Sequence, residues 1–396
     1  MGLIALIGFS AVVLLAMALL HGYLWWRLVR GTTRPGRSRR RLTLLTVVLA
    51  ALPVAVVVTG SRLPRAVATP LDWVGYTWLG LVFYLFLATL ATEPIRVALR
   101  LLRRSRQAEE DGAGLSRRRF LALGAGALAM GVAGTGVVLA NSAPVVRRVP
   151  ISIPRLDPAL AGLRIVTFSD GHLSATYGGR RFERVVETVN AQRPDVVAIV
   201  GDLVDGEVDE LREDAALLAD LVSEQGVFFV TGNHEYFVDT RAWLRHLPTL
   251  GIDVLRNERV PIRRGSASFD LAGIDDRTAE SSGLPGHGAD LDAALDGRDD
   301  AVPVVLLAHQ PVQVAQARAA GVDLQLSGHT HGGQLWPFDY AVLLDQPVVE
   351  GWSQQGPTQL YVTSGAGNWG PPMRVGARPE VTVIELQPGE PTAPSR

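Results

Sequence analysis

Four long apolar stretches stand within the first 140 residues of this 396-residue chain. They run over residues 3–26, 42–60, 73–92 and 120–140. Each is close to the ~20 residues with which a helix crosses the hydrocarbon core of a bilayer. Helices buried in a soluble core rarely lack charges over such lengths. We therefore predict four transmembrane helices within a membrane region at residues 1–142.

The charge balance separates this region from the rest of the chain. Residues 1–140 carry 17 Arg against 5 acidic residues, and residues 141–396 carry 21 Arg against 34, so the net charges are +12 and −13. The two parts are therefore expected to face different surroundings. The chain has no Cys and no Lys, which excludes disulfides, thiolate metal sites, Schiff-base chemistry and a Walker lysine. Any metal must be held by His, Asp, Glu or Asn.

The arginines also predict an orientation. Seven lie at 27–41 and eight at 96–119, whereas the loop between the second and third stretches has two, Arg62 and Arg65. Because cytoplasmic loops of membrane proteins are enriched in Arg, both rich segments should be cytoplasmic. We expect a multi-pass protein of the cell membrane whose residues after 140 lie on the extracytoplasmic side.

The fourth stretch opens with the sequence Ser116-Arg117-Arg118-Arg119-Phe120-Leu121. This pattern is similar to a twin-arginine export signal, a receptor-read address that would make the export machinery a partner. A plain cytoplasmic Arg flank explains the same residues. The sequence leaves both interpretations open, together with the question of cleavage after the span.

Beyond the membrane region, the sequence predicts an α/β domain. Residues 143–162 are rich in Pro and are expected to form an extended tether. Short apolar runs then alternate with helical patterns at 181–191 and 210–223, which is typical of buried strands between helices. We place the domain at 163–388 and a disordered tail at 389–396. The clearest strands are 163–168, 196–200, 227–230, 304–307, 324–326 and 361–363.

Residues of metal-binding types follow five of these runs. Ligand sites of α/β sheets lie at the carboxyl ends of the strands, so the five clusters should converge. The supply is enough for two metal ions, and a bridging carboxylate would hold them the ~3.5–4 Å apart that two-metal phosphoryl transfer uses. The clusters are Asp170-Gly171-His172, Gly201-Asp202-Leu203-Val204-Asp205, Gly232-Asn233-His234-Glu235, His309 and Gly328-His329-Thr330-His331.

In this order the five clusters resemble the signature of the calcineurin-like metallophosphoesterase family: D-x-H, G-D-x-x-D, G-N-H-[DE], a lone His and G-H-x-H. The extension Gly332-Gly333-Gln334 and the tail from Pro371 to Arg374 look like the membrane-anchored subgroup of that family. The resemblance covers roughly residues 150–388. It implies a four-layer sandwich, two mixed sheets flanked by helices, and two divalent metal ions, Mn, Fe, Zn or Co.

The resemblance also implies roles for individual residues. Asp170, His172, Asp202 and His331 would hold one metal ion. Asn233, His309 and His329 would hold the second, with Asp202 bridging. His234, with Asn233, would act in catalysis, and Asp205 would orient the ligands.

Two further patterns have competing explanations. The run Gly365-Ala366-Gly367-Asn368-Trp369-Gly370 matches a dinucleotide fingerprint, but the prolines that follow disfavour a phosphate-binding helix. We expect a loop at the rim of the metal site, with Trp369 and Arg374 as substrate contacts. Asp275 and Asp276 could form a third carboxylate site, but an exposed pair in a strand-end turn is favoured.

The predicted function is therefore a membrane-anchored, metal-dependent phosphoric ester hydrolase. A metal-activated hydroxide would cleave a phosphodiester or pyrophosphate bond, and the membrane location suggests a phosphate-ester substrate from an envelope lipid or cell-wall polymer. One alternative is a nuclease or nucleotide phosphodiesterase, although the charge of −13 disfavours nucleic acid as a partner. Another is a non-catalytic receptor or scaffold that retains a structural metal site.

Overall fold

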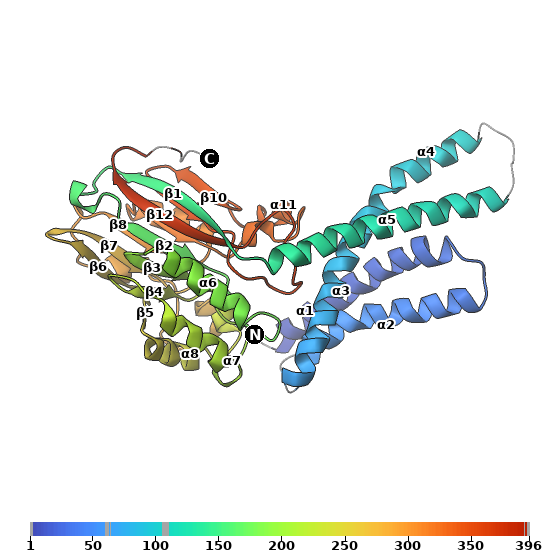
Figure 1. Cartoon of the computed structure of the whole chain (residues 1–396), viewed down its shortest axis with the longest axis horizontal. Helices are drawn as coiled ribbons and strands as arrows, with labels where there is room; N and C mark the ends of the chain where they lie inside the picture. The colour runs from blue at the N-terminus through green and yellow to red at the C-terminus, as the bar shows by residue number, and fades with distance from the viewer. Residues whose placement is uncertain (1–2, 60–62, 64, 105–110, 392, 394–396) are drawn as a thin grey trace. The chain divides into compact units, whose positions relative to one another are not determined.

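The computed structural model describes residues 3–59, 63, 65–104, 111–391 and 393 (Figure 1). The chain forms two compact units. One comprises Met1–Val138 with Gly370–Met373, and the other comprises Leu139–Trp369 with Arg374–Arg396. The predicted disordered tail at 389–396 lies partly outside the described residues.

The first unit is helical. A short π-helical segment, Trp25–Arg30, continues its first helix, and Arg27 forms an ion pair with Glu93. Tyr23 donates a hydrogen bond of 2.9 Å to the same carboxylate. The helices are α1 (Leu3–Leu24), α2 (Arg37–Thr59), α3 (Arg65–Ala91), α4 (Glu93–Arg104) and α5 (Asp111–Ala140).

Two of the four predicted transmembrane helices are long and apolar enough, over the described residues, to cross a membrane. They lie at Arg65–Leu99 and Arg117–Ala140 and include the predicted spans 73–92 and 120–140. The side chains of α1 are described only from residue 14, and those of α2 only to residue 56. The apolar part of α2 that remains, from residue 42, is shorter than a bilayer span. Four spans are therefore not shown.

The second unit contains two six-stranded mixed sheets. In the first, β2, β3, β4 and β5 are parallel, and β12 runs antiparallel to β2. In the second, β7, β8, β9 and β11 are parallel, with antiparallel β6 and β10 at the edges. The strands are β1 (Val145–Ile153), β2 (Arg164–Phe168), β3 (Val196–Val200), β4 (Val227–Val230), β5 (Ile252–Val254), β6 (Glu258–Arg264), β7 (Ala267–Gly273), β8 (Val304–Leu307), β9 (Leu324–Ser327), β10 (Gly351–Gln355), β11 (Thr358–Val362) and β12 (Glu380–Pro388).

The prediction of an extended tether at 143–162 is wrong for residues 145–153. Residues 145–153 form β1, which pairs in parallel with β12 along nine residues. Val149, Ile151 and Ile153 point to one buried face, as the period of a strand requires. Pro150 is tolerated because β1 is an edge strand, where a missing N–H donor leaves no ladder bond unmade.

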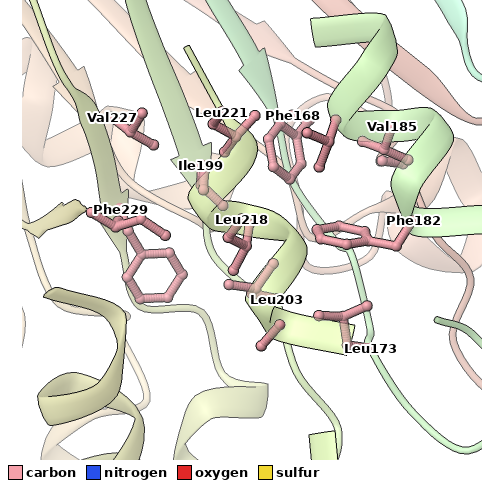
Figure 2. Close-up of a cluster of buried hydrophobic side chains, with 14 of the residues drawn as sticks. Phe168, Leu173, Phe182, Val185, Ile199, Leu203, Leu218, Leu221, Val227 and Phe229 are labelled. Carbon is pink, nitrogen blue, oxygen red and sulfur yellow. The ribbon is translucent and has the colours of Figure 1, made fainter. Parts of the chain in front are cut away.

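The two sheets pack face to face, and helices cover their outer faces. Side chains such as Ile165, Val200 and Phe269 fill the space between the sheets. Figure 2 shows the layer outside the first sheet, where Phe168, Ile199 and Phe229 meet Phe182 of α6 and Leu218. This arrangement confirms the predicted α/β fold with two mixed sheets and helices. The helices of this unit are α6 (Arg180–Ala191), α7 (Val208–Ala215), α8 (Thr240–His246), α9 (Leu291–Leu295), α10 (Val314–Ala319) and α11 (Asp339–Val342).

Candidate metal centre

The five sequence clusters converge on one site in the second unit. Each cluster follows the carboxyl end of a parallel strand: β2, β3 and β4 of the first sheet and β8 and β9 of the second. The carboxyl ends of parallel strands meet at one edge of a sheet, which is why residues as distant in sequence as Asp170 and His331 become neighbours. Asp170 and His329, for example, meet when the His329 backbone N–H donates to the Asp170 carboxylate at 3.0 Å.

Three predicted ligands, Asp170, His172 and His331, form what we call the Asp170 group. Their donor atoms all lie within 4.8 Å of one another. The Nε2 atoms of His172 and His331 are 3.0 Å apart, and the His331 Nε2 atom is 3.4 Å from Asp170 Oδ1. All three side chains are buried. Three donor atoms at this spacing could hold one metal ion.

The other three predicted ligands, Asn233, His309 and His329, form what we call the His309 group. Donor atoms of His309, His329 and Asp202 also lie within 4.8 Å of one another. The Asp202 carboxylate is 3.1 Å from His309 Nε2 and 4.0 Å from His172 Nε2. Asp202 therefore stands between the two groups, where a bridging ligand would lie.

The His309 group contains the clearest sign that the site suits a metal ion. Asn233 Oδ1, His309 Nε2 and His329 Nδ1 are buried side-chain atoms that no well-aligned hydrogen bond satisfies, although His309 Nε2 has the Asp202 carboxylate 3.1 Å away. An unsatisfied buried polar atom costs about 1–3 kcal/mol, so three together need an explanation. A divalent cation accepts lone pairs from all three atom types, and the donor set therefore fits a metal ion.

The histidine rings of the site differ in protonation state. His309 Nδ1 lies 2.7 Å from the carbonyl oxygen of Val200, which can only accept a hydrogen bond, so Nδ1 carries a hydrogen. Burial alone would lower the pKa of His309, but Asp202 raises it well above its ordinary value, so Nε2 is also protonated in the metal-free protein and a bound ion would displace that proton. Burial, together with the neighbouring His309, lowers the pKa of His329 to about 3. Burial and the neighbouring His172 lower the pKa of His331 well below its ordinary value. Both rings are then neutral at pH 7, which is the form that binds metals.

One carboxylate orients two histidines of the site. Asp205 Oδ1 lies 2.9 Å from His172 Nδ1 and 2.6 Å from His234 Nδ1. Burial alone would raise the pKa of Asp205, but the two histidines lower it below its ordinary value. Burial alone would lower the pKa of His234, but Asp202 and Asp205 raise it to about 9. His234 is therefore protonated at neutral pH in this structure, with its Nε2 atom 4.0 Å from Asp202.

Backbone strain is concentrated at the same residues. Eight non-glycine residues in the described part of the chain have a positive φ, and five of them are predicted ligands. The left-handed region disfavours L-amino acids, and such strain persists where the surrounding structure enforces it. The five are Asp170, His172, Asp202, His329 and His331, with φ between 46° and 72°.

The sequence reasoning gave no role to Glu235, which the structure places beneath the site. Its buried carboxylate accepts the backbone N–H groups of Gly232, Asp202 and Leu203 at 2.6, 3.0 and 2.8 Å. Burial and the nearby Asp202 raise the pKa of Glu235 to about 7. Glu235 thus joins the loops after β3 and β4. The acidic residue after Asn233-His234 was the available signal, but only the fold shows what it contacts.

The structure corrects the prediction for Arg374. Arg374 is fully buried and does not contact the rim. Its guanidinium donates to the backbone carbonyls of His331, Ser364, Gly365 and Gly367, and it lies 3.2 Å from His331 Nδ1. It therefore holds the 364–367 loop against a predicted ligand.

Trp369 does lie at the rim. It is 56% exposed, and its ring is 5.6 Å from the ring of His234. The exposed ring of Phe237 is 5.0 Å from the same histidine. Two aromatic side chains thus flank the exposed side of His234.

The favoured interpretation of Asp275 and Asp276 as an exposed pair is wrong. Both are fully buried. Asp275 forms an ion pair of 2.6 Å with Arg256, and Asp276 accepts hydrogen bonds from Thr278 and Gln310. They fix loops beside the site.

Several known proteins are similar in sequence to this chain. The model of the calcineurin-like phosphoesterase family matches residues 163–333, which include every predicted ligand. A transmembrane protein with metallophosphoesterase domain from Danio rerio is 42% identical over 296 residues, covering 73% of this chain and 67% of that protein. Its counterpart from Bos taurus is 41% identical over 262 residues, covering 64% of this chain and 59% of that protein.

A bacterial relative matches over nearly its whole length. An uncharacterized metallophosphoesterase of Bacillus subtilis is 32% identical over 289 residues, which cover 69% of this chain and 98% of that protein. The chain spans less than two thirds of the bovine relative but almost all of the bacterial one. The family-model match and these relatives show that the chain belongs to the calcineurin-like phosphoesterase family, in its membrane-anchored subgroup. The clusters of possible metal ligands at the strand ends agree with this assignment.

Proposed function

We propose that this protein is a membrane-anchored phosphoesterase with two metal ions that hydrolyses a phosphodiester or pyrophosphate bond. The observation that supports this most directly is the set of three buried donor atoms on Asn233, His309 and His329 that no well-aligned hydrogen bond satisfies. They lie beside a second, compact group of donors, with Asp202 between the two. A structural metal site needs one such group, whereas two groups that share a carboxylate are typical of two-metal hydrolysis.

In this proposal the Asp170 group and Asp202 would hold one divalent ion, and the His309 group would hold the second, with Asp202 contributing to both. Two bound ions would polarise a phosphoryl oxygen and make a nucleophile available from water at neutral pH. The protein orients the ligands that would hold these ions. Asp205 orients the ring of His172, and the His309 ring is oriented by the Val200 carbonyl.

His234 is the proposed acid. Asp205 holds its Nδ1 atom, so the Nε2 atom is the one that faces the centre. In the metal-free protein Asp202 and Asp205 outweigh burial and raise its pKa to about 9, so the ring carries a proton at neutral pH. With ions on Asp202, Asp205 is the carboxylate that would retain this proton. When the bond from phosphorus to the leaving oxygen breaks, this proton can pass to that oxygen, or it can hydrogen-bond to a phosphoryl oxygen. The side chain is 12% exposed, so a substrate can reach it.

The proposed substrates are phosphate compounds of the cell envelope, such as a phospholipid, a lipid-linked pyrophosphate or a cell-wall polymer. The apolar helices at Arg65–Leu99 and Arg117–Ala140 support a location at the membrane. The arginine-rich segments support a multi-pass arrangement with the phosphoesterase domain on the extracytoplasmic side. Export of that domain by twin-arginine machinery is part of the proposal and rests on residues 116–121 alone.

The test uses the full-length protein in lipid nanodiscs, stripped of metal and reloaded with Mn²⁺. Hydrolysis of a chromogenic phosphodiester is measured beside the matching monoester, and bound metal is counted by mass spectrometry. We expect metal-dependent diester cleavage that His234→Ala abolishes while both ions stay bound. If that variant kept normal turnover, the assigned acid would be wrong. If two ions bound and neither ester was cleaved, the protein would be a metal-containing scaffold.

A further inference from the structure

The exposed apolar side chains of the second unit gather in one place. Among its described residues, nine large hydrophobic side chains are exposed, and only Val146 and Val222 lie elsewhere. Exposed apolar patches of this kind mark interaction sites. The other seven, which we call the rim surface, are Phe237, Trp336, Phe338, Tyr340, Leu343, Leu344 and Trp369.

The rim surface borders the metal centre. The Gln334 side chain, three residues after His331, makes two hydrogen bonds with the backbone of Trp369, at 2.8 and 3.0 Å. The backbone N–H of Trp336 donates to Val375 at 2.8 Å, which starts the exposed segment at residues 336–344 beside the same loop. Trp369 itself contacts His234. Trp369 and Phe237 therefore border the exposed side of His234, and the exposed segment at residues 336–344 begins beside them.

The point where the chain enters this unit lies on the same side. Asn141, one residue after α5 ends, accepts hydrogen bonds from Arg181 and Arg184 of α6 at 2.9 and 3.0 Å. Arg181 also donates to the carbonyl of Thr176, and the neighbouring Tyr177 donates to the carbonyl of Ala366 at 3.0 Å. The next residue of that loop, Gly367, donates to the backbone of Asp170 at 2.9 Å.

The connection is also short. Only residues 141–144 separate the end of α5 at Ala140 from the start of β1 at Val145. Even fully extended, this connection spans no more than about 18 Å. If α5 crosses a bilayer, the side of the domain that holds Asn141 must stay close to the membrane surface, and the entrance to the metal centre is on that side.

We propose that the rim surface inserts into the boundary between lipid and water and holds the entrance of the metal centre at the lipid headgroups. Trp, Tyr and Phe are the side chains that favour this boundary, and Leu343 and Leu344 would enter the acyl region. The rim then selects phosphate groups that are attached to lipids and lie at headgroup depth. This inference takes the membrane location from the proposed function but does not depend on catalysis.

The experiment exploits the absence of cysteine, because one introduced cysteine can be labelled uniquely. Full-length Phe338→Cys and Leu344→Cys are spin-labelled and placed in vesicles of phosphatidylcholine and phosphatidylglycerol. Collision rates with oxygen, which concentrates in lipid, and with a water-soluble nickel chelate then report the depth of each label. Residue 344 is 89% exposed and residue 338 is 55% exposed, so these substitutions should leave the fold intact.

Val222→Cys is the matched control. Val222 is 66% exposed and apolar, but it precedes β4, whereas the metal centre lies beyond the carboxyl end of that strand. We expect the ratio of oxygen to nickel collisions to rise at residues 338 and 344 relative to residue 222. Equal ratios at all three residues would overturn the proposal. Shielding of residues 338 and 344 from both reagents would also overturn it, because that result means a protein covers the surface.

A functional readout separates this inference from the proposed activity. A Phe338→Ser, Leu344→Ser double variant should lose hydrolysis of a bilayer-embedded diester while it retains cleavage of a soluble chromogenic diester. Equal retention of both activities would contradict the inference and leave the phosphoesterase intact. If the unmodified protein cleaves no ester, the proposed function fails, whereas the depth measurement still decides whether the rim surface enters the bilayer.

Discussion

The Asp170 group and the His309 group offer similar donor atoms, yet the surrounding protein supports them differently. In the Asp170 group every side chain has a neighbour that orients it: Ser169 for Asp170, Asp205 for His172 and Arg374 for His331. In the His309 group each side chain has a buried atom that no well-aligned hydrogen bond satisfies, and His309 alone is oriented through its other ring nitrogen. The first group is therefore held by more hydrogen bonds, whereas the second depends more on the ion. Arg374 can only donate, so the His331 hydrogen lies on Nε2, and an ion bound there would displace it.

This difference suggests that the Asp170 group and the His309 group, the two half-sites of the centre, bind their metal ions with different affinities. Partners behind a metal ligand typically raise metal affinity or activity by about 10–100-fold. We therefore expect the Asp170 group to bind its ion more tightly and the His309 group to exchange its ion more readily. The following predictions test this comparison.

The largest effect should come from Asp202→Asn, because Asp202 belongs to both half-sites. Loss of its second charged oxygen should lower diester hydrolysis by more than the ~100-fold that a supporting residue contributes. Bound metal, counted by mass spectrometry, should fall below two ions per chain. Asp195→Asn is the control, since that buried carboxylate precedes β3, at the opposite end of the strand from the centre, and its loss should leave metal content unchanged. Two retained ions in Asp202→Asn would refute the bridging role.

Metal titration should reveal two classes of site that differ in affinity by roughly 10–100-fold. His329→Ala should remove the weaker class and His172→Ala the tighter one, as followed by calorimetry with Mn²⁺ on the metal-free protein. If the two substitutions removed the opposite classes, the comparison between the half-sites would be reversed.

Asp205→Asn should affect both the Asp170 group, through His172, and the proposed acid His234. The pKa of His234 is about 9 against an ordinary value of 6.5, so its ion pair stabilises the metal-free fold fully below pH 6.5 and loses this contribution as the pH rises through 9. In the variant the pKa of His234 should fall toward 6.5, as measured by NMR titration. Diester hydrolysis should fall by about 10–100-fold. An unchanged His234 pKa would show that Asp205 does not set it.

The smallest effect should come from Ser169→Ala. Ser169 donates to the Asp170 carboxylate, which also accepts the His329 backbone N–H, so one of its supports remains. The loss of one hydrogen bond should cost about 0.5–1.5 kcal/mol, or several-fold in affinity for the tighter ion. A loss as large as that of His172→Ala would mean that Ser169 has a further role.

The ligand residues could be predicted because each follows an apolar run that can only be a buried strand. The period and length of residues 163–168 and 196–200 place Asp170 and Asp202 at strand ends without any knowledge of the fold. The two mixed sheets came from the family resemblance. Residues 145–153 were misread because Pro150 and neighbouring prolines hid the alternation of Val149, Ile151 and Ile153.

The supporting contacts could not be predicted in the same way. Arg is rarely buried unless it is paired, so a loop Arg after two prolines was expected to be exposed. Arg374 is buried because four backbone carbonyls, of His331, Ser364, Gly365 and Gly367, converge on its guanidinium. Glu235 and Asp276 likewise acquire their roles from loops that are distant in sequence. Such contacts depend on the finished arrangement of loops, which local patterns do not contain.

The left-handed backbone of the five predicted ligands lowers the stability of the fold at the residues on which activity would depend. Glycine adopts such conformations without steric cost, whereas each Asp or His held there costs about 1–3 kcal/mol. A glycine at residue 172 or 329 should therefore relieve strain, even as it removes a donor atom. Substitutions chosen for stability alone would therefore remove the donor atoms of this centre. Five strained side chains in one place lower the stability of the fold, a cost that is expected where a structure serves a function.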